Sequence, residues 1–210
     1  MNISFKQRTF PPSFRTAQIT PLVKKSRVDD DDPASYRSIS NLNTISKVIE
    51  RLFLPRILPH VSSSINFNPV HSAYRKHHST ETALLKIMAD IYGVIDKGRA
   101  TILVVLDMSA VSDTIDHDVL IQCLRHTFGM SGMSGRCLYW LASYLGQRQS
   151  FVRWGSRRSA RSRCKVGVQQ SSSLGPLLFA LYIAPLAKVI RRLVFTTTAS
   201  MPTICNCTYS

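Results

Sequence analysis

An aspartate that directly follows a short apolar run is the first candidate for chemistry. Asp107 ends the segment Thr101–Leu106, whose β-branched residues show no alternation and predict a strand buried on both faces. A carboxylate at the end of a buried strand is held rigidly at a cleft, as metal-assisted phosphoryl transfer requires. Spacing alone leaves a second interpretation open, in which Asp107 caps a turn or the next helix.

A turn rich in glycine and serine precedes the most apolar stretch of the chain. Residues 167–173 lead into Leu174–Ile190, and Pro176 lies near the first turn of the helix that this stretch predicts. The backbone N–H groups at a helix N-terminus favour phosphate and other anions. Many helices begin with serine and proline, so the pattern alone does not distinguish an anion site from an ordinary cap.

Two arginines each follow a tyrosine, in Tyr36-Arg37 and Tyr74-Arg75. Guanidinium groups bind triphosphates and nucleic-acid backbones through paired hydrogen bonds. The alternative for each is an arginine on a solvated surface.

Charge is distributed unevenly along the chain. The 210 residues include 27 Lys and Arg against 12 Asp and Glu, which gives a formal net charge of +15. Every acidic residue lies between Asp29 and Asp118, whereas residues 119–210 carry 12 Lys and Arg and no acid. Such a field attracts polyanions, nucleic acid first and anionic membrane second. It also excludes any mechanism that needs a carboxylate within residues 119–210.

Hydrophobic periodicity predicts a mixture of helices and a few strands, and therefore an α+β or α/β domain. An apolar face begins at Thr44 and ends near Pro55. The clearest helix runs from Thr80 to Asp96, capped by Ser79 or Thr80, with Glu81 in its first turn and Gly98 just past its end. Its predicted buried stripe consists of Leu84, Ile87, Met88, Ile91, Tyr92 and Ile95.

In the second half of the chain, the sequence pattern predicts shorter helices and strands. Asp116 and His117 cap a helix that has Asp118 in its first turn. Its inward residues are predicted to be Val119, Leu120, Cys123, Leu124 and Phe128. A further helix spans Leu138–Leu145 and ends at Gly146. Strands at Phe151–Trp154 and Arg163–Val168 flank a basic turn at residues 157–161.

The cysteines and the apolar segments indicate the compartment in which the protein is expected. The five cysteines include no C-x-x-C pair, which favours reduced thiols in an intracellular protein over disulfides or structural zinc. Residues 1–10 lack the pattern of a secretory signal. Leu174–Ile190 is short for a membrane span, so we expect a buried helix there and no contact with a membrane.

Taken in order, these segments resemble the reverse transcriptase of non-LTR (LINE-type) retrotransposons, especially the jockey and CR1-like branch. The likeness runs from Phe10 to about Ile190. The opening motif corresponds to residues 14–25, and Tyr36-Arg37-Ser-Ile-Ser matches Y-R-P-I-S. Residues 73–85 match F/Y-R-x-x-H-S-T-E-T-A-L-L, residues 106–117 match the metal-binding motif, and residues 167–179 match G-V-P-Q-G-S-x-L-G-P-L-L-F.

The resemblance implies an α+β fold with the fingers and a partial palm of a right-hand polymerase. It implies Mg²⁺ as cofactor, with an RNA template and a DNA primer as partners. It assigns Asp107 as the catalytic, metal-binding aspartate, and it assigns the nucleotide site to Ser112, Gln170, Arg75, Arg37, Lys24 and Lys25. The implied domain covers residues 14–192, after an N-terminal segment at 1–13 and before an off-pattern tail at 193–210.

Three departures from the family pattern bear on activity. Ser112 replaces the aromatic residue that stacks near the incoming sugar, and Gln169 and Ser171 replace the proline and glycine around Gln170. A Cβ at position 171 stands where glycine serves backbone conformation or close approach. No acid follows Asp118, so the aromatic-Ala-Asp-Asp hairpin and its second essential carboxylate are missing, as is the thumb.

We therefore expect a reverse transcriptase fragment that does not turn over. The alternatives are a non-catalytic basic remnant that binds RNA or DNA, and a translated relic without a stable fold. The tail is consistent with a frameshift between about Arg191 and Ser200, because a frame shifted by one can encode Tyr-Ala-Asp-Asp from Ser200 onward.

Overall fold

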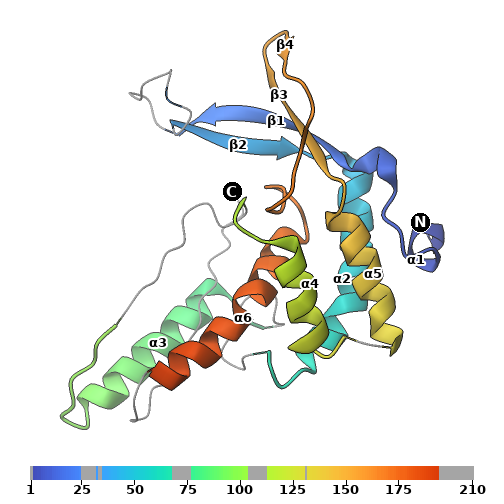
Figure 1. The fold of residues 1–210 in the computed structure, drawn as a ribbon. Coiled ribbons are helices and arrows are strands. Elements are labelled where there is room, and N and C mark those ends of the chain that lie inside the picture. Colours follow the sequence, from blue (N-terminus) through green and yellow to red (C-terminus); the bar gives the residue numbers. More distant parts are fainter. Residues whose placement is uncertain are drawn as a thin grey trace.

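Helices and a small mixed sheet occupy separate parts of the molecule (Figure 1). The structure, a computed structural model, describes residues 2–24, 32, 35–67, 77–103, 113–130 and 132–193. In Figure 1 the sheet lies at the top, above most of the helices. The α+β class expected from the sequence is confirmed.

The sheet joins the beginning of the chain to its second half. Strand β1 (Thr16–Val23) pairs antiparallel with β2 (Tyr36–Asn41) and parallel with β3 (Gln149–Trp154). Strands β4 (Arg157–Arg158) and β5 (Ser162–Arg163) both pair antiparallel with β3. A two-residue turn links β3 to β4, and Gly155 in it has a φ of +55°, which suits a tight hairpin turn.

The strands β1 and β2 were not predicted from the sequence. Both contain several polar residues, and β1 also contains Pro21. Pro21 is tolerated within β1 because it lies beyond Ile19, the last β1 residue that pairs with β3. On the other side of β1, Pro21 is opposite Ser38 of β2. Predicted strand Arg163–Val168 is mostly irregular, since β5 ends at Arg163 and only Val166 makes an isolated bridge.

The core lies among helices α2 (Thr44–Ser62), α4 (His117–His126), α5 (Gly132–Leu145) and α6 (Gly175–Leu193). Trp140 of α5 is its largest fully buried side chain and stacks on Phe53 of α2, with ring centroids 4.2 Å apart. The short helix α1 (Asn2–Lys6) and the 3₁₀ turn η1 (Pro12–Phe14) precede β1, and Phe5 and Phe10 add their rings to the same cluster.

Helix α2 is longer than predicted. It continues through Pro55 and Pro59 to Ser62, although a proline removes a backbone hydrogen bond. Ile57 and Val61, which follow Pro55, are both fully buried, and their burial offsets the missing bonds.

Helix α3 (Thr80–Ile95) begins and ends as predicted, but its apolar stripe does not form core. Ser79 caps it through a reciprocal hydrogen-bonded box with Thr82. Only Ala83 is buried, whereas Leu84, Met88, Tyr92 and Ile95 are exposed and Ile87 and Ile91 are half-buried. The amphipathic pattern therefore predicted the helix correctly and its packing incorrectly.

The region around Asp116 follows the prediction closely. Asp116 caps α4 by accepting hydrogen bonds from the backbone N–H groups of Asp118 and Val119. Leu120, Leu124 and Phe128 are buried and Cys123 is half-buried, but Val119 is exposed. Upstream, Thr101–Leu103 is exposed irregular chain rather than buried strand, and the rest of that predicted strand lies outside the described residues.

The apolar stretch that begins at Leu174 forms α6, whose buried residues include Leu177, Leu178 and Leu181. This confirms the buried helix expected there. Among the described residues, no helix combines the length and hydropathy that crossing a bilayer requires.

Candidate functional site

Two of the predicted chemical segments meet in space. Gly167, which begins the loop before α6, donates its N–H to the carbonyl of Ile115 at 2.7 Å. His117 Nε2 lies 2.7 Å from the carbonyl oxygen of Gly167, and Asp116 forms a bridge with Val166. The end of the Asp107 motif is thus joined directly to the segment that carries Gln170.

A buried carboxylate holds the other end of this loop. Glu50 on α2 is fully buried, and its Oε2 accepts hydrogen bonds from Ser172 Oγ at 3.0 Å and from the backbone N–H of Ser173 at 2.7 Å. Its Oε1 accepts hydrogen bonds from Ser46 Oγ at 3.2 Å and from the Tyr144 hydroxyl at 3.1 Å. Four donors from three parts of the chain therefore converge on one carboxylate.

The backbone N–H groups at the start of α6 therefore find their hydrogen-bond acceptors within the protein. Ser172 Oγ accepts hydrogen bonds from the N–H groups of Leu174 and Gly175, at 3.1 and 3.2 Å, and Glu50 supplies a negative charge beside them. A carboxylate near a helix N-terminus is favourable for the same reason that a bound phosphate is. The side chains at this helix start thus act as a cap, and the anion beside it is Glu50.

A second buried side chain, Arg148, approaches the loop from the end of α5. Its Nε donates to the carbonyl of Tyr144 at 2.7 Å, and its Nη1 donates to Gln169 Oε1. Its guanidinium lies 3.9 Å from the centroid of the Tyr144 ring and 5.3 Å from that of Phe10. Burial raises the pKa of the Tyr144 hydroxyl, so this group donates its proton to the network throughout the neutral range.

Sequence reasoning missed Glu50, Tyr144 and Arg148. A signal for Glu50 was present, because Ile49, Phe53 and Ile57 recur at helical spacing on the same side of α2, and a carboxylate among them requires partners. Nothing comparable marked Arg148, whose guanidinium lies near the ring of Tyr144, four residues earlier, and near that of Phe10 from a distant segment.

Ser171 adopts the left-handed backbone conformation that glycine favours, with a φ of +73°. This agrees with the conformational reason inferred for the family's glycine at this position. The Ser171 hydroxyl donates a hydrogen bond to the carbonyl of Ser40 in β2. Both loop residues that depart from the family pattern, Gln169 and Ser171, therefore use their side chains to attach the loop to its neighbours.

Replacing Ser171 separates these two effects. We expect S171G to be more stable than S171A by about 1 kcal/mol, because both lose the bond to Ser40 and only alanine keeps the strained φ. Urea unfolding of the two variants measures the difference. Equal stabilities would show that the backbone at this position relaxes without strain.

Some of the predicted nucleotide-site residues lie in the part of the chain that the structure describes, and others lie outside it. Gln170 is half-buried, between two loop residues whose side chains are bonded. Arg37 is exposed on β2, three residues before Ser40, and Lys24 is exposed just after β1, where its N–H donates to the carbonyl of Ser35. Asp107, Ser112, Arg75 and Lys25 lie outside the described residues, as does the tail from 194 onward.

Successive residues of a strand alternate between the two faces of the sheet. Arg37 and Ser40 are three positions apart, so they lie on opposite faces. Ser40 and Ala17 are buried, and their face is the one turned to the rest of the protein. Arg37 therefore points away from the face that contacts the Ser171 loop.

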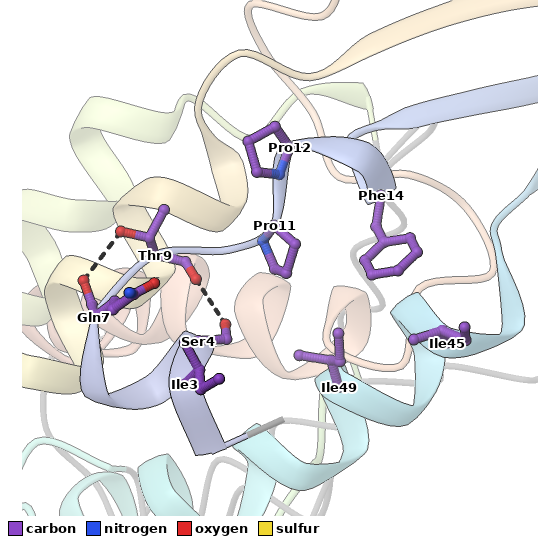
Figure 2. A pocket seen from close by; sticks show the side chains of 9 residues that line it. All are labelled: Ile3, Ser4, Gln7, Thr9, Pro11, Pro12, Phe14, Ile45 and Ile49. Carbon is purple, nitrogen blue, oxygen red and sulfur yellow. Dashed lines mark hydrogen bonds between the residues drawn. The ribbon is translucent and has the colours of Figure 1, made fainter.

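A separate cavity of about 360 Å³ lies between the N-terminal segment and α2 (Figure 2). Its walls include Pro11, Phe14 and Ile49, and no charged side chain lines it. Ser4 Oγ donates to the carbonyl of Thr9, so polar groups in the wall are already engaged with one another. A cavity without cations is poorly suited to a triphosphate.

The described residues contain no cluster of three or more His, Cys, Asp or Glu that could hold a metal ion. A two-metal site needs carboxylates from two motifs. Residues 119–210 contain no acid, so no carboxylate from that part of the sequence can contribute to such a site.

Comparisons with known proteins agree with the family resemblance. The family model "Reverse transcriptase (RNA-dependent DNA polymerase)" matches residues 23–208. Two Drosophila melanogaster proteins are similar in sequence. "Probable RNA-directed DNA polymerase from transposon BS" is 30% identical over 186 residues, which cover 88% of this chain and 20% of the relative. "Probable RNA-directed DNA polymerase from transposon X-element" is 31% identical over 187 residues, which cover 86% and 19%. The chain thus spans about a fifth of the length of these relatives.

The fold is also similar to that of a solved structure. The chain resembles an apo telomerase from Candida tropicalis, truncated from its C-terminal domain, with a TM-score of 0.54 and 14% sequence identity. The match covers 90% of this chain and 41% of the telomerase chain. At this identity the likeness establishes the mixed α+β arrangement and nothing about chemistry.

Proposed function

The chain belongs to the reverse transcriptase (RNA-dependent DNA polymerase) family, and from this premise we propose that it is the fingers and part of the palm of a retrotransposon polymerase. Its partners are an RNA template and a DNA primer, and its domain covers residues 14–192. The family match over residues 23–208 is the observation that carries the proposal.

In this proposal Gln170 lines the site of the incoming nucleotide. Support comes from the rigidity of its surroundings, because Arg148 and Glu50 hold the loop on either side of it. Binding residues work best when buried neighbours fix their position. Ser112 would lie near the sugar, while Arg37, Arg75, Lys24 and Lys25 would contact the triphosphate or the template.

The proposed metal is Mg²⁺, and Asp107 is its ligand from this chain. Mg²⁺ prefers oxygen ligands such as carboxylates and would neutralise the charge of a bound triphosphate. Because a second carboxylate motif is missing from the 210 residues, we propose that this chain by itself binds nucleotide without joining it to a primer.

The test is a titration of the purified chain with a fluorescent dNTP and Mg²⁺, beside a primer-extension assay on an RNA template. We expect no extended primer, and we expect Gln170→Ala to weaken dNTP binding by about tenfold, which corresponds to about 1.4 kcal/mol. Gln122→Ala, on the exposed surface of α4, is the matched control and should bind as the unmodified chain does.

Two results would contradict parts of the proposal. Primer extension that disappears in Asp107→Ala would show that one carboxylate motif suffices for turnover. Equal dNTP affinity in the Gln170 variant and the control would remove Gln170 from the nucleotide site.

A second candidate is a basic module that binds nucleic acid without any nucleotide chemistry. The acid-free stretch from 119 to 210, with its exposed arginines, favours it. The two candidates separate in the titration above, because a simple nucleic-acid binder has no Gln170-dependent affinity for dNTP.

A further inference from the structure

Exposed apolar side chains on α2 continue the surface of the cavity in Figure 2. Ile49 lines the cavity and is buried, whereas Ile45, four residues earlier, also lines it but is 47% exposed. Val48 and Leu52 are exposed as well. Positions three and four apart lie on the same side of a helix, so Ile45, Val48 and Leu52 form one apolar stripe that begins at the cavity.

The cavity itself lies between two parts of the chain. Figure 2 shows Pro11 and Phe14 of the N-terminal segment on one side of it and Ile45 and Ile49 of α2 on the other. Ile3 of α1 also lines the cavity and is exposed. Its volume of about 360 Å³ is within the range of pockets that hold a ligand. We name this cavity, together with its exposed apolar neighbours, the α1–α2 groove: Ile3, Ile45, Val48 and Leu52.

Cations border the α1–α2 groove. Lys6 of α1 and Arg51 and Arg56 of α2 are exposed. Each of them lies three or four residues after a groove residue on the same helix, which makes the two side chains neighbours. The Arg56 guanidinium also lies 4.2 Å from the centroid of the Phe5 ring of α1, so this cation is held between the two helices.

No exposed acid balances these cations on the elements around the groove. Residues 1–28 and 33–80 contain a single acid, Glu50, and its carboxylate is buried in the network that holds the loop before α6. Helix α5, which contacts both α1 and α2, contains no acid. The described elements α1, η1, α2 and α5 therefore present an apolar surface bordered by positive charge.

We propose that the α1–α2 groove binds an acidic amphipathic helix of a partner protein, which inserts one apolar side chain into the cavity. The proposal does not depend on the polymerase function proposed above. A helix docks in an apolar groove through anchors at i, i+3, i+4 and i+7, and Ile45, Val48 and Leu52 offer a stripe with the same repeat. Acidic side chains beside those anchors would meet the three bordering cations.

Three other occupants match the groove less well. A second copy of this chain would place the same cations opposite one another across a symmetric interface. A bilayer surface has no protruding side chain that would fill the cavity. A nucleic acid would bring phosphates to an apolar cavity whose walls carry no charged side chain.

The test measures the binding of fluorescent model peptides to the 210-residue chain by anisotropy, at physiological salt concentration, in EDTA and without dNTP. Each peptide has about 18 residues, enough for a helix to form, with leucines and one phenylalanine at helical spacing. The remaining positions are glutamate and glutamine in the acidic peptide, and lysine and glutamine in the basic one. We expect the acidic peptide to bind at least tenfold more tightly. An acidic peptide with alanine in place of the phenylalanine should bind several-fold more weakly, because nothing then fills the cavity.

One pair of variants tests the apolar stripe. Ile45→Ser/Leu52→Ser removes two exposed apolar groups from the groove and should weaken binding of the acidic peptide at least tenfold. Leu84→Ser/Val119→Ser changes equally exposed apolar residues of α3 and α4 and should alter the affinity less than twofold. Thermal unfolding of both variants is the folding control, and we expect similar midpoints because all four side chains are exposed.

A second pair of variants separates the bordering cations from the net charge of the protein. Lys6→Gln/Arg51→Gln should weaken binding of the acidic peptide several-fold. Arg99→Gln/Arg125→Gln removes the same charge from exposed positions after α3 and on α4, and should change the affinity less than twofold.

Several outcomes would overturn the inference. Equal affinities for the acidic and the basic peptide would exclude an acidic partner. Equal losses in the groove variants and their controls would mean that the peptide binds elsewhere. The groove would belong to another occupant if Ile45→Ser/Leu52→Ser abolished binding of a 20-nucleotide RNA, binding of phosphatidylserine vesicles or self-association in sedimentation. Because Gln170→Ala should leave peptide binding intact, failure of the nucleotide site and failure of the groove give different results.

Discussion

Replacing Glu50 by alanine is expected to lower the free energy of unfolding by about 3–4 kcal/mol. The variant leaves the Tyr144 hydroxyl, the Ser173 N–H and two serine hydroxyls without their shared acceptor in a buried region. It also removes the negative charge beside the first N–H groups of α6. Urea unfolding followed by circular dichroism measures the change.

Two variants show whether the effect belongs to the network. Tyr144→Phe removes one of the four donors and should cost about 1 kcal/mol. Glu81→Ala removes an exposed glutamate from the first turn of α3 and should have a much smaller effect than Glu50→Ala. If Glu50→Ala were no more harmful than Glu81→Ala, the Glu50 carboxylate would not be holding the loop.

Trp140→Ala is expected to destabilise the fold by about 3–5 kcal/mol, the range for truncating a large buried aromatic residue. The indole stacks on Phe53 and Tyr144, with centroids 4.2 and 5.6 Å away, and its Nε1–H donates to Ser4 Oγ at 3.0 Å. Loss of the indole opens a cavity between α2 and α5 and removes the hydrogen bond that attaches α1 to α5.

The adjacent residue provides the control for this variant. Tyr139 precedes Trp140 on α5 but is 59% exposed, so Tyr139→Ala should cost far less. Chemical denaturation of both variants gives the comparison. Similar losses would mean that the aromatic cluster around Trp140 is not the centre of the core.

Local signals in the sequence predicted several elements well. Asp116 and Ser79 are caps, and a capping hydrogen bond depends only on residues two or three positions away. Gly146 ends α5 as expected, and the buried helix at α6 follows from the length of its apolar run. These features were predictable because their causes lie within one or two turns of chain.

Features that depend on distant partners were not predictable in this way. The stripe of α3 has the pattern of a core helix but is mostly exposed, since periodicity reports amphipathicity and not what covers the apolar face. Helix α2 passes Pro55 because Ile57 and Val61 are buried against elements far away in sequence. Strand β1 escaped prediction because its pairing with β3 crosses most of the chain.

The same distinction between local causes and distant partners applies to the candidate site. The motifs predicted a turn around Gln170 and, at position 171, a need for either a glycine-like conformation or close approach. The φ of +73° at Ser171 fits the first of these reasons. The motifs did not predict that Glu50 and Arg148 would hold this loop, because their roles come from burial created by the tertiary fold. Asp107 as metal ligand and Gln170 as nucleotide contact stay predictions.

The parallel pairing of β1 with β3 has a consequence for synthesis. Thr16 pairs with Gln149, and Phe10 N–H reaches Ser143 Oγ across 133 positions. At about 5–20 residues per second, a ribosome needs on the order of ten seconds to produce the partner of β1. During that interval the edge of β1 that later pairs with β3 is open, and such edges invite pairing with other chains. We therefore expect a nascent chain that is most vulnerable to aggregation before β3 emerges.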